Sequence, residues 1–334
     1  MNCEDDMGPR RCRRMATLVW LLVALLTGLW GGTEARAKLC GDDVDGQDVP
    51  CACGDTVVGN LVLTDDPVAS ASCPGDGLII RAGTSGGSTV DLAAKSIRGS
   101  GRGAGLWIVD AGGGGVRLVS TGGTATIEKF YDGVVAQGAA SVSAIEGLSI
   151  RDSGRDGMRL YDVEGVAVRD IEVVRSGRDG VWVNGRRYSI VASRAADSGR
   201  HGLNLMGTEG SIGAAGAGNV VEGSGAAGFV LMGMDHRITE CIVSGAAGDG
   251  IKFMGMRYEL SGCLAEDNGG DGIAGRGGEI VLKDNRANHN ENDGILVSGG
   301  ALQDGGGNVG LENRGRLKRR AVVQCEIGGV PCVP

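Results

Sequence analysis

The stretch GDGIKFMGMRYELSGCLAEDNGGDGI, residues 248–273, contains the repeat that decides the fold. Its Asp-Gly-Ile at 249–251 returns at 271–273 and again at 293–295, which is a period of 22 residues. Equivalent glycines follow one another along the chain at intervals of 22 to 26 residues: Gly133, Gly157, Gly180, Gly202, Gly228, Gly250, Gly272 and Gly294. Such regular spacing, in a chain with 64 glycines, indicates a stack of repeated units rather than an ordinary globule.

Each unit has the pattern of a strand, a bend and a second strand. The residue after the glycine is apolar, and so in most units is the residue two further on, as in Ile251 and Phe253. Alternation with a period of two is typical of a strand with one buried face. A second glycine usually follows, as at Gly255, where a bend with positive φ is easiest without a Cβ.

A single unit cannot bury its own apolar face, whereas stacked units bury a continuous column and pair every strand with the coils above and below. Gly77 and Gly105 open similar strands earlier in the chain, so we expect about ten coils. Helical repeats are disfavoured because the units lack an i, i+3, i+4 apolar pattern and contain several glycines each. The sequence predicts an all-β, right-handed parallel β-helix.

The first 37 residues are typical of an export signal: four arginines, an apolar run from Met15 to Trp30, then Ala35-Arg36-Ala37 as a cleavage site. The apolar run is shorter than the roughly 20 residues of a membrane span, so we expect no stable membrane insertion after cleavage. This predicts a protein that is secreted, periplasmic or on the cell surface.

Eight cysteines follow the signal, and an even number in an exported chain favours disulfides. We expect Cys241 to pair with Cys263, one repeat away, and Cys325 to pair with its near neighbour Cys332. The other four would staple an N-terminal cap over residues 38–76. The β-helix would then cover 77–313, and 314–334 would form a basic tail that contains the last cysteine pair.

Without residues 1–37 the chain has 28 basic and 37 acidic residues. A negative balance argues against nucleic acid as a partner. The basic cluster within 314–320 is more typical of a solvated tail than of a binding site. We expect a monomer.

The Asp-Gly-Ile repeats, together with Thr-Val-Asp-Leu at 89–92 and Ile-Arg-Gly-Ser-Gly at 97–101, resemble the bacterial right-handed β-helix repeat family with a pectin-lyase-like fold. The resemblance covers roughly residues 77–313. It implies the fold more strongly than any function, because one fold carries many unrelated activities.

One column of residues precedes the strand glycines: Asp132, Asp156, Asp179, His201, Ala227, Asp249, Asp271 and Asp293. The first interpretation is structural, since an aspartate before glycine bonds nearby backbone amides at a turn. Stacked carboxylates also repel one another, and such a column can raise a pKa or attract a cation, for which calcium is the candidate.

The catalytic hypothesis concentrates on Asp156, Asp179 and His201, because His201 interrupts the aspartate column. Glycosidases use paired carboxylates, and the order of these three residues resembles that of polygalacturonase-type hydrolases. The chain departs from that pattern, since Gly180 follows Asp179 where a second aspartate is expected and residues 229–231 lack the basic strand. A lyase or uronate epimerase, with outward arginines neutralising the substrate, is the alternative enzyme class.

Strand alternation also places polar and aromatic residues outward on consecutive coils: Arg159, Tyr161, Trp182, Asn184 and Asn204. An aromatic ring beside amide donors is what a sugar chain stacks on and bonds to. The predicted function is binding or modification of a polysaccharide or cell-surface glycan on this face. The alternative is a non-catalytic surface, structural or adhesion solenoid.

A third hypothesis is copper binding. Met206, Met232 and Met254 occupy one position on three adjacent coils, with His236 beyond the bend. Thioethers and imidazole suit copper(I), while methionines one coil apart also stack as an apolar ladder.

Overall fold

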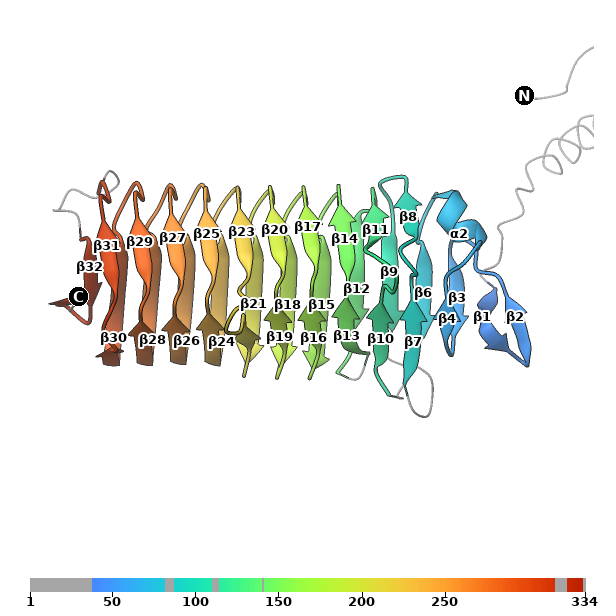
Figure 1. The fold of residues 1–334 in the computed structure, drawn as a ribbon, viewed down its shortest axis with the longest axis horizontal. Coiled ribbons are helices and arrows are strands. Elements are labelled where there is room, and N and C mark those ends of the chain that lie inside the picture. The colour runs from blue at the N-terminus through green and yellow to red at the C-terminus, as the bar shows by residue number, and fades with distance from the viewer. Residues whose placement is uncertain (1–37, 82–86, 110–113, 140, 316–322, 333–334) are drawn as a thin grey trace, which may run out of the picture. The chain divides into compact units, whose positions relative to one another are not determined.

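A computed structural model describes residues 38–81, 87–109, 114–139, 141–315 and 323–332. These residues form a right-handed parallel β-solenoid of about 11 turns, which confirms the predicted fold class (Figure 1). The expected export signal, residues 1–37, and most of the basic cluster lie outside the described residues.

The strands of successive turns form three columns. The first column comprises β3 (Asp55–Val58), β6 (Leu78–Arg81), β9 (Ala104–Val109), β12 (Asp132–Gln137), β15 (Met158–Glu164), β18 (Val181–Arg186) and β21 (Leu203–Thr208). The second comprises β4 (Leu61–Val62), β7 (Ser88–Asp91), β10 (Val116–Val119), β13 (Val142–Glu146), β16 (Ala167–Arg169), β19 (Ser189–Val191) and β22 (Ser211–Ile212).

In the later turns the first and second columns merge into long strands: β24 (Phe229–Thr239), β26 (Ile251–Ser261), β28 (Ile273–Lys283) and β30 (Ile295–Asp304). The third column is a separate sheet of short strands: β5 (Ser72–Cys73), β8 (Ser96–Gly99), β11 (Ala125–Glu128), β14 (Leu148–Arg151), β17 (Glu172–Val174), β20 (Arg194–Ala196), β23 (Val220–Glu222), β25 (Ile242–Ser244), β27 (Leu264–Glu266), β29 (Arg286–Asn288) and β31 (Val309–Leu311). A short helix, α2 (Pro67–Ser70), lies in the first turn.

Equivalent residues of neighbouring turns stand directly above one another. Phe229, Ile251 and Ile273 are in register across β24, β26 and β28, and none of the three is exposed. Leu205 and Phe253, assigned inward by alternation, are 0% and 2% exposed, so both side chains belong to the core. The strands form because this column is apolar in every turn and is buried only by stacking.

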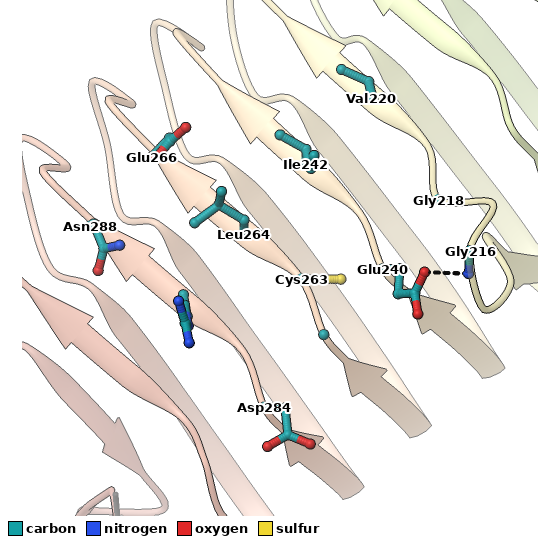
Figure 2. Close-up of a pocket in the computed structure, with 12 residues that line it drawn as sticks. Gly216, Gly218, Val220, Glu240, Ile242, Cys263, Leu264, Glu266, Asp284 and Asn288 are labelled. Atoms are coloured by element: carbon teal, nitrogen blue, oxygen red, sulfur yellow. Dashed lines mark hydrogen bonds between the residues drawn. The ribbon is translucent and has the colours of Figure 1, made fainter.

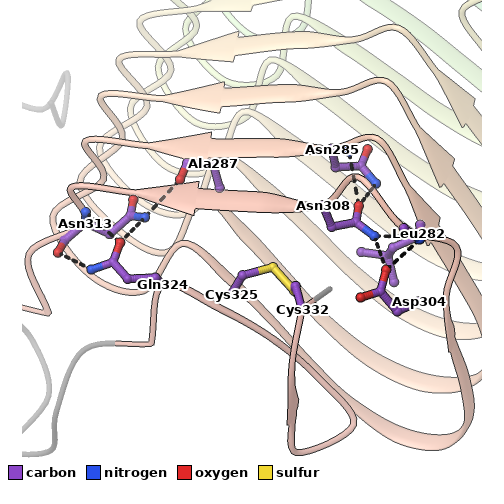
Figure 3. The surroundings of a disulfide bond; sticks show 10 residues. Leu282, Asn285, Ala287, Asp304, Asn308, Asn313, Gln324, Cys325 and Cys332 are labelled. Atoms are coloured by element: carbon purple, nitrogen blue, oxygen red, sulfur yellow. Dashed lines mark hydrogen bonds between the residues drawn. A yellow bond between two sulfur atoms is a disulfide. The ribbon is translucent and has the colours of Figure 1, made fainter. Parts of the chain in front are cut away.

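Polar ladders line the interior at the turns near the C-terminal end (Figure 3). Asn290 Nδ2 donates to Asn313 Oδ1 over 2.9 Å, and Asn285 Nδ2 donates to Asn308 Oδ1 over 2.9 Å. Asn313 in turn donates to Gln324 Oε1 over 3.0 Å. These contacts satisfy carboxamides that are otherwise costly to bury.

Both ends close with an antiparallel hairpin and a disulfide. At the N-terminal end β1 (Leu39–Val44) pairs with β2 (Gln47–Val49), and at the C-terminal end β32 (Cys325–Ile327) pairs with β33 (Val330–Pro331). Hairpins of this kind cover strand edges that would otherwise be free to associate. The disulfides join Cys40 to Cys51, Cys53 to Cys73, Cys241 to Cys263, and Cys325 to Cys332.

Four disulfides are typical of proteins in an oxidising, extracytoplasmic compartment. In the part of the chain that the structure describes, no helix has the length and apolar character needed to cross a membrane.

Candidate functional site

The residues that precede the strand glycines lie at one corner of successive turns and accept hydrogen bonds from the next turn. Asp132 Oδ1 accepts from the amide nitrogen of Asp156 over 3.2 Å, and Asp156 Oδ1 accepts from that of Asp179 over 3.2 Å. Asp179 Oδ1 accepts from the amide of His201 over 3.3 Å. The contact recurs farther along at 3.0 Å, between Asp249 and Asp271 and between Asp271 and Asp293. The carboxylates therefore link turn to turn, which is the structural interpretation of the column.

Asp156 and Asp179 are both buried, at 3% and 0% exposure. Burial raises the pKa of Asp156, and the nearby charges of Asp179 and Asp132 raise it further. Burial also acts to raise the pKa of Asp179, but hydrogen bonds from Arg200 and Asn204 outweigh it and leave that pKa lowered. Two adjacent carboxyls therefore have opposite pKa shifts, beneath the surface of the solenoid.

His201 interrupts the carboxylate column and is half-buried. Its Nδ1 accepts a hydrogen bond from the amide of Ala227 over 3.2 Å, so the imidazole takes the place of an aspartate in linking two turns. Burial lowers the pKa of His201, which favours the neutral ring with its proton on Nε2. The three residues of the catalytic hypothesis lie on adjacent turns, and each already bonds a backbone amide.

A pair of aromatic side chains lies on the outer face of β15 and β18. Tyr161 and Trp182 have ring centroids 6.0 Å apart and planes 10° apart, so the rings are stacked in parallel. The guanidinium carbon of Arg159 lies 5.3 Å from the centroid of the Trp182 ring. Tyr161 is 44% exposed. Trp182 and Arg159 are half-buried, and with Tyr161 they form one continuous cluster on the outside of two adjacent turns, which we call the aromatic platform.

A hollow of about 320 Å³ lies next to the aromatic platform. Asn184, which is in register with Tyr161, is one of its lining residues. Its polar lining also includes Asp162, Glu164, Arg186 and Thr208. Arg186 Nη2 bonds Glu164 Oε2 over 2.8 Å, so part of this lining is held in place by an ion pair.

Asn204 does not join this surface, although alternation assigns it outward. It is only 7% exposed, and its Nδ2 donates to Asp179 Oδ2 over 2.9 Å. Its amide is therefore engaged in holding a buried carboxylate and is not available to a ligand.

A larger hollow of about 690 Å³ lies on the third column of strands, and the sequence pattern did not predict it. Figure 2 shows Val220, Ile242 and Leu264 on its floor, on consecutive strands, and Glu240 at one side. The amide of Gly216 donates to Glu240 Oε2 over 2.6 Å. Gly216 belongs to the unusually long, 26-residue interval between Gly202 and Gly228, which was the only signal in the sequence for this hollow.

Among the residues that the structure describes, no group of three or more His, Cys, Asp or Glu side chains is placed so that it could hold a metal ion such as calcium. The calcium hypothesis therefore stays a prediction.

Residues 208–313 match the family described as the right handed beta helix region. No curated protein matches the chain in sequence. Among solved structures, the catalytic unit of an α-1,3-glucanase from Streptomyces thermodiastaticus is 12% identical, with 79% of this chain and 65% of the glucanase unit covered and a TM-score of 0.43. The chain thus spans less than two thirds of that unit.

Two further solved structures are similar. A periplasmic alginate epimerase is 17% identical, with 77% of this chain and 74% of the epimerase covered and a TM-score of 0.44. A pectate lyase is 11% identical, with 83% and 68% covered and a TM-score of 0.38. The turn architecture and the family match place the chain among proteins with a right-handed parallel β-helix.

Proposed function

We propose that the protein binds a polysaccharide on the outer face of β15 and β18, without cleaving or modifying it. The observation that carries this proposal is the parallel stack of exposed Tyr161 and half-buried Trp182 beside a polar hollow. Only 11 of the 334 residues are aromatic, and two of them stack here on the surface.

The chemistry of the platform suits a sugar chain. One face of a pyranose ring presents C–H groups that pack on an aromatic ring, while its hydroxyls need hydrogen-bond partners nearby. Trp182 and Tyr161 supply the ring surface, and Asn184 supplies both a donor and an acceptor at the edge of the hollow. Arg159, stacked on Trp182, adds a positive charge that favours an anionic polymer.

A hydrolase is the second candidate, and the opposite pKa shifts of Asp156 and Asp179 favour it. Against it, both carboxyls are buried and bond backbone amides. Catalysis at this pair requires the corner to open so that a glycosidic oxygen reaches Asp156. We therefore rank binding without turnover first, at the cell surface, in the periplasm or in the medium.

The test combines affinity electrophoresis with product detection. Anionic and neutral polysaccharides are cast into native gels, and retardation is measured for the native protein and for Trp182→Ala. The matched control is Trp107→Ala, since Trp107 is an outward tryptophan of the same column and is 38% exposed.

We expect one class of polymer to retard the native protein and the Trp107→Ala control but not Trp182→Ala. Equal retardation of all three proteins, or none, contradicts the proposal. In parallel, the release of reducing ends or unsaturated sugars is measured. Release by the native protein that is lost in Asp156→Asn would show that the protein is an enzyme and would overturn the proposal of binding alone.

A further inference from the structure

A square of four thioethers lies on the outer surface of β24 and β26. Met232 is in register with Met254, and Met234 with Met256, on adjacent turns. All four side chains are exposed, by 45%, 54%, 39% and 44% in that order. Six methionines follow residue 37, so most of them gather in this thioether square.

The backbone holds the square in a fixed geometry. Gly233 and Gly255 stand between the two methionines of each turn, with φ of +130° and +151°. A Cβ on Gly233 would lie 1.8 Å from the carbonyl oxygen of Gly207, so only glycine fits at this bend. Neighbouring turns are about 4.8 Å apart, and methionine has three rotatable side-chain bonds, so the four sulfurs can converge on one point.

The four thioethers are the soft metal ligands on this surface, because the cysteine sulfurs and the His236 imidazole are engaged elsewhere. All eight cysteines after residue 37 are in disulfides. His236, expected beside the methionine ladder, is only 1% exposed, and its Nδ1 accepts from the amide of Gly210 over 3.2 Å. The imidazole is therefore inside the solenoid and not on the face of the square.

Two nearby cations are paired with carboxylates. Arg257 forms an ion pair with Asp235, and one of its nitrogens lies 3.2 Å from Met234 Sδ. Lys252 pairs with Asp249 over 3.2 Å. Arg276, which is in register with Met254 on the next turn, is exposed and forms no ion pair among the described residues. A monovalent cation at the square therefore has to be held by the soft sulfurs beside this one positive charge.

We propose that Met232, Met234, Met254 and Met256 bind one soft monovalent cation, copper(I) or silver(I), through their sulfurs. Thioethers select soft ions and give little affinity to calcium, magnesium or zinc. The site is separate from the aromatic platform, and the proposal does not depend on polysaccharide binding.

The test is a titration of the purified protein with silver nitrate in chloride-free buffer, because silver(I) needs no reductant and leaves the disulfides intact. Methionine methyl groups labelled with ¹³C are followed by NMR. We expect the methyls of the four square residues to shift together and to saturate at one equivalent. The methyl of Met158, a buried methionine of β15, is the internal reference and should not move.

Two variants make the titration decisive. Replacing all four methionines with leucine keeps the volume and the apolar surface, so the fold is retained, and it should weaken silver(I) binding at least about 100-fold. Met158→Leu is the matched control and should bind as the native protein does. Unshifted square methyls, or equal silver(I) affinity in the four-leucine variant, overturns the proposal.

Discussion

Two regions of the solenoid, the turns around β15 and β18 and the turns from β27 to β31, have the same backbone architecture. They differ in the polar side chains that line their interior. At the same position after each third-column strand, the earlier turns have Ser153, Ser176, Ser198 and Ser224, and the later turns have Asn268, Asn290 and Asn313. The four serine hydroxyls are buried and find no hydrogen-bond partner among the described residues. Each asparagine bonds the next turn with its carboxamide.

The difference separates two ways of holding turns together. In the later turns the asparagine ladders cross-link neighbours through buried amides. In the earlier turns the serine at this position adds no bond within the described part of the chain, and the aspartates before the strand glycines link the turns, with Asp179 bonded by Arg200, Asn204 and the amide of His201. The same aspartate links also occur in the later turns. The turns that present the aromatic platform thus have serines where the later turns add an asparagine ladder to these aspartate links.

The largest effect is expected at the asparagine ladder. Asn290→Ala removes the acceptor for both nitrogens of Asn268 and one donor to the Ala265 carbonyl, so it should cost about 3 to 5 kcal/mol. Ser198→Ala, at the equivalent position, should change stability by less than about 0.5 kcal/mol, since its hydroxyl forms no bond there. Chemical denaturation measures both, and similar costs at the two sites would contradict the difference between the serine and asparagine positions.

A second prediction concerns the disulfide between Cys241 and Cys263, which lies in line with the ladder of Asn285 and Asn308. Cys241 and Cys263 occupy the turns between Asn219 and Asn285, so a covalent bond replaces two asparagines. Replacing both cysteines with alanine should cost about 3 kcal/mol, because the disulfide closes a loop of 22 residues.

Replacing both cysteines with asparagine should recover part of that loss, because Asn219 and Asn285 would then belong to one continuous ladder. Thermal unfolding under non-reducing conditions compares the two double variants. An asparagine pair no more stable than the alanine pair would show that the ladder cannot be extended through these turns.

A smaller effect on stability is expected from pH, through the aspartates that precede the strand glycines. The pKa of Asp179 is lowered in the folded protein, so its contribution to stability is present above the ordinary aspartate pKa and is lost as pH falls through the folded value. The pKa of Asp156 is raised, so its ionisation opposes folding once pH rises above the ordinary aspartate value.

At pH 7 Asp179→Asn should therefore destabilise the protein by about 1 to 3 kcal/mol, while Asp156→Asn should be neutral or stabilising. Denaturation curves between pH 3 and pH 7, a range about the usual aspartate pKa, should show the two variants converging toward the native protein at the acidic end. Equal losses for both variants at pH 7 would contradict the opposite shifts.

Much of the fold could be predicted from the sequence, because stacking imposes the same side-chain pattern on every turn. The Asp-Gly-Ile units locate β26, β28 and β30 directly. The third column is harder, since strands such as β17 and β20 have three residues each and too few positions to show a period.

The candidate site was predicted only in part. Alternation identifies the outward face, and Arg159, Trp182 and Tyr161 do meet there. It does not reveal what lies over a residue, so Asn204 was assigned to the surface although it is bonded to Asp179. The hollow beside Glu240 was not predicted either. The long interval that contains Gly216 lines a hollow only because it packs beside residues of the neighbouring turns, and those contacts are not visible in the sequence.

The most direct test of the account is calorimetric titration of the protein with the polysaccharide that retards it, comparing Trp182→Ala with Trp107→Ala. Loss of a central stacking surface should weaken binding about tenfold or more for Trp182→Ala, with less than about twofold change for Trp107→Ala. Equal affinities in the two variants would contradict the assignment of ligand binding to the aromatic platform.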